Sequence, residues 1–196
     1  MKVPLTIGDY LNRAAAVYGD RTAVVDEPSV AGSLGTLTYR ELDSRARGMA
    51  LALDRMGVDH GERVAIVSPN AAKFMISYFG VSAYGRILVP VNYRLNADEI
   101  SYIVDHSGSS VLLVDPESEG SLRGISAKHK IVLDGRADGE LFAPAADGAQ
   151  PAEWVGDEDA TASINYTSGT THGLRASSSP TGIAGSTPPP SAGIRR

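Results

Sequence analysis

The chain has 196 residues, of which 42% are hydrophobic and 21% are charged, and this length suffices for one sizeable core or two small ones. Its formal net charge of −5 excludes the strongly basic footprint of a nucleic-acid-binding protein. The absence of cysteine excludes disulfides, thiol catalysis and Cys-ligated metal sites. No apolar run reaches the length of about 18 residues that a membrane span needs, so we expect a soluble, cytoplasmic protein.

The first part of the chain predicts two helices with short strands between them. Thr6–Tyr18 carries apolar side chains on one helical face, and its threonine three positions before Asp9 is typical of a helix start. Thr22–Asp26 and Gly35–Tyr39 have the composition of short strands. Tyr39–Met56 repeats apolar residues at helical spacing, so we expect the clearest helix there.

From residue 63 onward, expected strands and helices alternate. They are, in chain order, strand Arg63–Ser68, helix Ala71–Tyr84, strand Ile87–Val91, a helix capped by Asn96 and ending at His106, strands Val111–Asp115 and Lys130–Asp134 with a weaker helical stretch between them, and a loop or linker over Asp138–Asp159. The first of these strands is almost continuously apolar, as expected when both faces of a parallel sheet are covered. The alternation predicts an α/β fold with a mostly parallel sheet and flanking helices, and it leaves the order of the strands open.

The last 23 residues differ from the rest in composition. Leu174–Arg196 contains four of the eleven prolines, five serines and three arginines, but no acidic or aromatic residue. Residues 1–173 hold 15 basic and 23 acidic side chains, so the tail also differs in sign of charge. Such a segment buries too little apolar surface to offset the entropy lost on ordering. We therefore expect a domain over residues 1–173 and a disordered Pro/Ser/Gly-rich tail over residues 174–196.

One segment carries recognisable chemistry, where a short predicted strand runs into a loop. Thr167, Ser168, Gly169, Thr170 and Thr171 place four hydroxyls and a glycine in five consecutive positions. Backbone N–H groups and hydroxyls of such a loop donate hydrogen bonds to phosphate oxygens without any side-chain charge. The Walker A pattern G-x-x-x-x-G-K-[ST] does not occur in the sequence. By composition alone, the segment fits either a phosphate site or an ordinary turn.

The sequence YTSGTT at 166–171 resembles the phosphate loop of the adenylate-forming superfamily, which includes acyl-CoA synthetases, peptide-synthetase adenylation domains and luciferases. Three upstream segments are similar to that family's N-terminal segments in order and spacing. They are LTYRELDSRARGMALAL at 37–53, GVDHGERVAIVSPN at 57–70 and VPVNYRLNADEISYIVDHSGSSVLLVD at 89–115, the last being most like the acyl-CoA synthetase branch. The resemblance covers residues 4–171 and implies an incomplete N-terminal domain of such an enzyme.

This resemblance implies a ligase that uses ATP, Mg²⁺, coenzyme A and a carboxylic (fatty) acid. The full enzyme would form an acyl-adenylate, release pyrophosphate and pass the acyl group to coenzyme A. Residues 167–171 would then hold the β- and γ-phosphates of ATP, with Mg²⁺ sharing their charge. The family's acid pocket, adenine motif, ribose-binding aspartate and C-terminal catalytic lysine have no match in this sequence. We therefore expect no catalytic residue here and a chain that is nearly inactive by itself.

The resemblance stops directly after the phosphate motif. The family continues with Gly-x-Pro-Lys-Gly, whereas this chain has His172 and then Gly-Leu-Arg-Ala, and the neighbours of Arg175 do not fit the role of the missing lysine. Residues 173–183 can be encoded by a set of synonymous codons that also carries a second peptide. When this DNA is read in a shifted frame, it encodes Pro-Lys-Gly-Val-Gln-Leu-Thr-His-Arg-Asn. That is the continuation expected of the family, so our hypothesis is that a frame change near His172 produced the tail.

Two other functional classes remain open besides a ligase fragment. They are a noncatalytic remnant and an interaction module that self-associates through exposed apolar surface. Its four histidines, His60, His106, His129 and His172, follow no metal-ligand pattern, so we expect surface or packing roles and no metal site. Trp154 is isolated in the linker and is expected to pack the linker onto the core.

Overall fold

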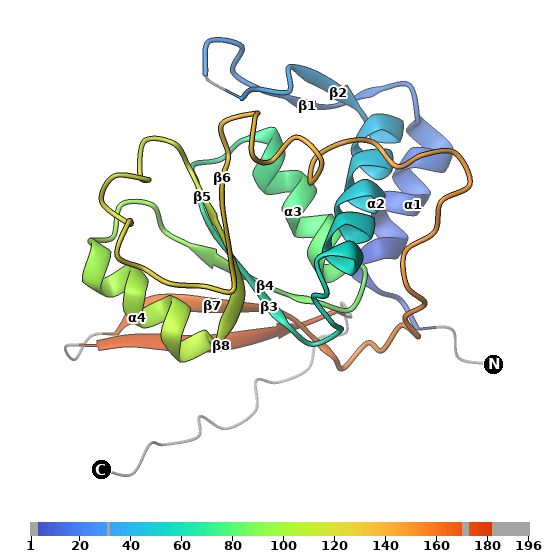
Figure 1. The fold of residues 1–196 in the computed structure, drawn as a ribbon. Helices are drawn as coiled ribbons and strands as arrows, with labels where there is room; N and C mark the ends of the chain where they lie inside the picture. Colours follow the sequence, from blue (N-terminus) through green and yellow to red (C-terminus); the bar gives the residue numbers. More distant parts are fainter. Residues whose placement is uncertain (1–3, 31, 170–172, 182–196) are drawn as a thin grey trace.

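The computed structural model describes residues 4–30, 32–169 and 173–181 (Figure 1). Within these ranges the chain forms four helices and eight strands. The helices are α1 Ile7–Tyr18, α2 Tyr39–Arg55, α3 Ala72–Ser82 and α4 Ala97–Ser107. The strands are β1 Thr22–Val25, β2 Thr36–Thr38, β3 Arg63–Val67, β4 Ile87–Val91, β5 Ser109–Val114, β6 His129–Val132, β7 Thr161–Gly169 and β8 Gly173–Pro180. None of the described helices is long and apolar enough to cross a bilayer.

Six of the strands form one sheet in the order β6-β5-β3-β4-β7-β8, and β1 pairs with β2 in a separate antiparallel ribbon. In the large sheet every neighbouring pair is parallel except β7 and β8. Helices α1, α2 and α3 lie together on one side of this sheet, and α4 lies on the other (Figure 1). The predicted α/β fold with a mostly parallel sheet and flanking helices is confirmed.

The central strands are buried on both faces. Val64 and Ile66 of β3 pack in one apolar cluster with α2 and α3, whereas Ala65 and Val67 of the same strand pack in a second cluster with α4. All four side chains have no exposed surface. Because successive side chains of a strand point to opposite faces, the continuous apolar sequence serves two cores at once.

Short-range hydrogen bonds set the helix starts that the sequence predicts. At α4, the side chain of Asn96 accepts the N–H of Glu99 at 3.0 Å, and the Glu99 carboxylate accepts the N–H of Asn96 at 3.0 Å. At α1, the Asp9 carboxylate accepts the N–H of Thr6 at 2.7 Å. These side chains accept hydrogen bonds from backbone N–H groups at the helix start that have no partner within the helix. The predicted starts of α1 and α4 are both confirmed.

The weaker helix predicted between the fifth and sixth strands is wrong. Residues 116–124 form a series of turns instead. Pro116 opens the segment, and Gly120 and Gly124 make a helical conformation costly within its nine residues. The segment still contributes to the core with α4, because Leu122 is buried there.

Residues 138–159 contain no helix or strand, as predicted, but they are firmly attached to the domain. Leu141 and Phe142 are buried in the apolar cluster with α2 and α3. The partly buried indole of Trp154 lies against Gly85, where an added Cβ would come within 2.6 Å of the ring. The prediction that Trp154 packs this linker onto the core is confirmed.

The prediction of a disordered tail from residue 174 is wrong for the first residues of that tail. Residues 173–180 form β8, whose backbone pairs antiparallel with β7 from Thr161–Pro180 to Gly169–Gly173. Thr181 follows, buried, with its N–H donating to the carbonyl of Ala160 at 2.8 Å. Small polar side chains suffice here because backbone hydrogen bonds, rather than apolar burial, hold the hairpin. The rest of the predicted tail, residues 182–196, lies outside the described residues.

A buried ion pair joins α3 to the segment after β6. The Nζ atom of Lys73 lies 2.5 Å from Oδ2 of Asp138 and donates to the carbonyl of Leu133 at 3.0 Å. The other oxygen of Asp138 accepts the N–H of Gly135 at 2.7 Å. The side chains are 6% and 1% exposed, so each charge depends on the other for compensation.

A second charged contact joins the end of α2 to the start of β4. The buried guanidinium of Arg86 donates to the carbonyl of Val58 at 2.9 and 2.7 Å and to Asp54 at 2.5 Å. The second oxygen of Asp54 accepts the N–H of Ala152 at 2.8 Å. The linker is thereby tied to the same point as the α2–β3 turn.

We predict that Asp138→Asn lowers the free energy of unfolding by about 3–5 kcal/mol, because it leaves the Lys73 ammonium buried without its counter-charge. Urea unfolding followed by circular dichroism measures this. The matched control is Asp20→Asn, whose partner Arg40 is 67% exposed and whose own side chain is 93% exposed, so its unfolding curve should stay that of the wild type. Equal stability of the two variants would contradict the structural role of the buried pair.

We also predict a stability change at alkaline pH that comes from Tyr84. Burial, followed by the negative charge of Asp43, raises the pKa of Tyr84 from 10.0 to about 12, against an opposing effect of Arg47. The unfolded chain loses this proton near pH 10 and the folded chain near pH 12, so folding stability should fall across that interval by about 2–3 kcal/mol. Urea unfolding from pH 9 to 12 should show this loss in the wild type and not in Tyr84→Phe. An equal fall in the free energy of unfolding of both proteins over this range would refute the prediction.

Candidate functional site

The loops after β3 and β4 leave the sheet in opposite directions. The chain after β3 turns to α3 on one face, whereas the chain after β4 turns to α4 on the other face. Because β3 and β4 are neighbours, a crevice opens between their carboxyl ends. In open α/β sheets this switch point is the usual place for a ligand.

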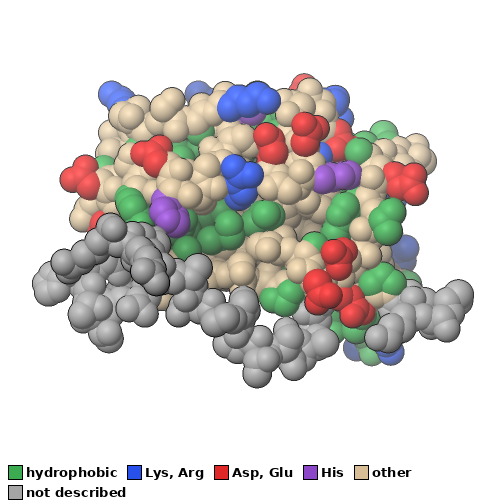
Figure 2. Space-filling view, turned by 90° about the horizontal axis from the view of Figure 1, so that it is seen from below, with side chains coloured by type: hydrophobic (Ala, Val, Ile, Leu, Met, Phe, Trp, Pro, Cys, Tyr) green, Lys and Arg blue, Asp and Glu red, His purple; other side chains and the backbone are tan. Residues whose placement is uncertain are grey.

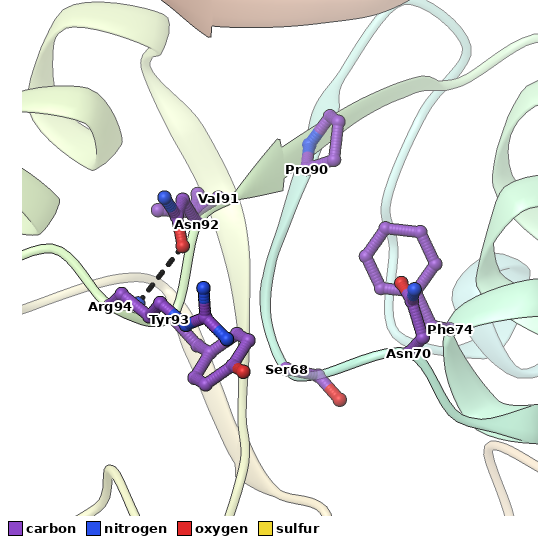
Figure 3. A pocket seen from close by; sticks show the side chains of 8 residues that line it. All are labelled: Ser68, Asn70, Phe74, Pro90, Val91, Asn92, Tyr93 and Arg94. Carbon is purple, nitrogen blue, oxygen red and sulfur yellow. Dashed lines mark hydrogen bonds between the residues drawn. The ribbon is translucent and has the colours of Figure 1, made fainter. Parts of the chain in front are cut away.

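A pocket of about 510 Å³ lies at this switch point (Figure 3). Its walls come from both loops, the end of β4 and the first turn of α3: Ser68, Asn70, Phe74, Pro90, Val91, Asn92, Tyr93 and Arg94. Asn70 and Phe74 lie across the opening from Asn92, Tyr93 and Arg94 (Figure 3). One wall therefore offers an aromatic ring and an amide, and the opposite wall offers the only cation among the lining residues.

Local hydrogen bonds shape this pocket. The side chain of Asn92 accepts the N–H of Arg94 at 3.0 Å, which closes a tight turn directly after β4 (Figure 3). The guanidinium of Arg94 lies 5.4 Å from the centre of the Tyr93 ring, within the range of a cation–π contact. The hydroxyl of Ser68 donates to the carbonyl of Pro69 at 2.9 Å. A flat ring beside a positive charge suits a ligand with an anionic group and a planar or apolar part.

Sequence reasoning assigned no role to the pocket residues. All of them except Phe74 lie in segments 57–70 and 89–115, which carry the family resemblance but contain no motif that marks a site. The pocket depends on β3 and β4 being neighbours with helices on opposite faces, and hydrophobic periodicity does not specify strand order. The turn signal Asn-Tyr-Arg after an apolar strand was the one local indication of a loop there.

The predicted phosphate residues lie at the end of β7. Thr167, Ser168 and Gly169 belong to the strand, so the expectation that they form a loop is wrong, while Thr170 and Thr171 lie outside the described residues. The strand continues because β8 pairs with it, with Thr167 opposite Arg175. Thr167 is exposed to solvent. Thr167 is thus accessible to a ligand, and hydroxyl donors fit phosphate oxygens.

Tyr166, directly before the phosphate residues, is held by α4. Its hydroxyl lies 2.8 Å from Nδ1 of His106, and the two rings meet edge to face with their centres 5.8 Å apart. Burial raises the pKa of Tyr166, with a smaller contribution from Tyr102. His106 also stacks on Tyr102 at 5.2 Å, so the packing role expected for this histidine is confirmed.

Within the described residues, no three His, Asp or Glu side chains are grouped closely enough to hold a metal ion. His172, the histidine nearest the phosphate motif in the sequence, lies outside the described residues.

Comparison with known proteins gives a consistent family assignment. Residues 11–172 match the model of a family described as AMP-binding enzyme. The chain is 34% identical over 177 residues to a long-chain-fatty-acid–CoA ligase of Thermus thermophilus, covering 87% of this chain and 32% of that protein. It is 32% identical over 170 residues to the long-chain-fatty-acid–CoA ligase FadD13 of Mycobacterium tuberculosis, covering 83% of this chain and 32% of that protein.

The fold matches as well as the sequence. The crystal structure of the N-terminal domain of FACL13 from Mycobacterium tuberculosis is similar with a TM-score of 0.77 and 30% identity, over 90% of this chain and 44% of that domain. The chain spans about a third of the length of the curated relatives it matches.

Proposed function

Because the chain belongs to the AMP-binding enzyme family, we propose that it supplies the phosphate-binding part of an ATP-dependent acyl-CoA ligase. The carboxylate of a fatty or other organic acid would attack the α-phosphorus of ATP and displace pyrophosphate. The thiolate of coenzyme A would then attack the acyl carbon and displace AMP. The names of the relatives, which are ligases of fatty acids and coenzyme A, support this reaction class.

The observation that carries the proposal is the position of Tyr166–Gly169, the described part of the YTSGTT segment, at the carboxyl end of β7. We propose that Thr167, Ser168, Gly169, Thr170 and Thr171 bind the β- and γ-phosphates through hydroxyl and backbone N–H donors. Donors fixed in advance at the leaving pyrophosphate stabilise the charge that develops there. Mg²⁺, bound with ATP, would share that charge.

The chain by itself is proposed to bind ATP phosphates but to turn over poorly. The acid pocket, the adenine and ribose contacts and the C-terminal lysine implied by the family have no match in these 196 residues. Without them the reacting carboxylate is not positioned against the α-phosphorus, and positioning supplies a large part of the rate in such reactions.

We predict that Thr167→Ala weakens the binding of ATP and Mg²⁺ by about ten-fold or more, because a hydrogen bond to a charged group is worth about 1.5–3 kcal/mol. Isothermal titration calorimetry on the purified chain measures the dissociation constant. Thr36→Ala, at an exposed strand position in β2, is the matched control and should bind like the wild type.

The same samples should show no ATP–pyrophosphate exchange with a panel of carboxylic acids. Unchanged affinity in Thr167→Ala would remove the proposed phosphate role, and robust exchange by the wild type would remove the proposed inactivity.

We also propose that residues from about 174 onward derive from a change of reading frame near His172. The support is that synonymous codons for residues 173–183 can be chosen which read as the family's Pro-Lys-Gly continuation in the alternate frame. The DNA sequence across codons 172–183 decides the point. Codons that cannot be read as Pro-Lys-Gly in the alternate frame would refute it.

A second candidate function, self-association, has one specific observation in its favour. Val25 is 74% exposed and Met75 is 41% exposed, and both border an apolar pocket of about 400 Å³ between β1 and α3. Figure 2 shows a further band of hydrophobic side chains across the face seen from below. Exposed apolar surface of this kind marks interfaces. A molecular mass that rises with concentration in sedimentation equilibrium would favour this function over an isolated ligase domain.

A further inference from the structure

β7 lies beside β4 in the sheet, and β4 ends at Val91 whereas β7 runs on to Gly169. Its backbone register with β4 is set at Leu88–Ser163, six residues before the strand ends. Its other neighbour is β8, which belongs to the same hairpin. Side chains of β7 therefore have to fix the orientation of residues 164–169 on the domain.

Two side chains of β7 do this. Ile164 and Tyr166 are partly buried against the apolar cluster with α4. They lie two residues apart, so they point to the same face of the strand, and Thr167 points to the other face, where it is exposed. A slip of one residue would turn Thr167 toward α4 and place Tyr166 in solvent.

The polar contact of this anchor is with His106, which lies on the exposed side of α4. Nδ1 of His106 lies 2.8 Å from the Tyr166 hydroxyl, and stacking on Tyr102 keeps the imidazole in place. The backbone of His106 is itself fixed, because Ile103 and Val104 of the same helix are buried and α4 ends one residue later. The imidazole thus presents a nitrogen at a defined point to the residue that precedes Thr167.

We propose that His106 is a positioning residue for phosphate binding: by holding the Tyr166 hydroxyl against α4, it keeps the end of β7 in the orientation that exposes Thr167. This inference rests on the proposed function, in which Thr167 donates to the phosphates of ATP. His106 does not itself touch the ligand in this assignment. His106 acts on Thr167 indirectly: it hydrogen-bonds to Tyr166, and Tyr166 is joined to Thr167 by one peptide bond.

The test uses His106→Phe, which keeps a ring on Tyr102 but has no nitrogen, and Tyr166→Phe, which keeps the ring but has no hydroxyl. The double variant completes a cycle. Tyr102→Phe is the matched control, because it removes a hydroxyl from the same cluster without removing the contact between His106 and Tyr166. Amide hydrogen exchange of residues 164–169 and the dissociation constant for ATP with Mg²⁺ are measured on the full chain.

Each single variant should speed the exchange of the 164–169 amides by about three- to ten-fold, the range expected for loss of one hydrogen bond, and should weaken ATP binding by a similar factor. The double variant should be no worse than either single variant, because both remove the same contact. The melting temperature and the exchange of α2 amides should not change. Tyr102→Phe should match the wild type in every measurement.

Three results would overturn the assignment. Wild-type exchange in His106→Phe would show that the imidazole does not hold the strand. Fully additive effects in the double variant would show that the two residues act separately. Faster exchange with unchanged ATP affinity, in a chain where Thr167→Ala does weaken affinity, would show that the anchor does not position the donors. If the wild type fails to bind ATP at all, the proposed function falls, and the positioning of Thr167 for phosphate falls with it, while the exchange data still decide whether His106 anchors β7.

Discussion

The burial of β3 on both faces is the constraint on which the rest of the structure depends. Its alternating side chains have no exposed surface on either side, so helices must cover both faces. A right-handed crossover to β4 places α3 on one face, and the return across β3 to β5 places α4 on the other. The loops after β3 and β4 therefore diverge, and the pocket between Asn70 and Arg94 exists because of that divergence. A site for a ligand is a geometric consequence of covering an apolar strand twice.

Ion pairs hold segments that contain no helix or strand against the rest of the domain. Lys73 on α3 and Asp138 after β6 lie in the apolar interior, where an unpaired charge would be costly, so the loop that carries Asp138 is held against the helix. Arg86 and Asp54 do the same for the linker at Ala152. The linker thus belongs to the domain although its composition, rich in Ala, Pro and Gly, resembles that of a free connection.

The sequence predicted those parts of the fold that local interactions determine. The starts of α1 and α4 follow from hydrogen bonds between residues three positions apart, which a sequence displays directly. Strand order, the switch-point pocket and the contact of His106 with Tyr166 join residues far apart in the chain, and no periodicity encodes them. Two of the three wrong expectations have a common cause. Local sequence favours a weak helix between Asp115 and Lys130 and a disordered tail over residues 174–196, whereas the glycines at 120 and 124 oppose the helix and backbone pairing with β7 orders residues 173–180.

The phosphate motif shows why a short sequence pattern is not yet a site. Hydroxyl donors bind an anion well only when they face one point, and a strand presents its side chains alternately to two faces. Tyr166 and Thr167 are neighbours in the sequence and face opposite ways, so burying one against α4 is what exposes the other. The tyrosine of YTSGTT therefore has a physical role distinct from that of the residues after it. Its burial leaves Thr167 on the exposed face of β7, and α4, which the switch at β4 places beneath the strand, provides the surface that buries it.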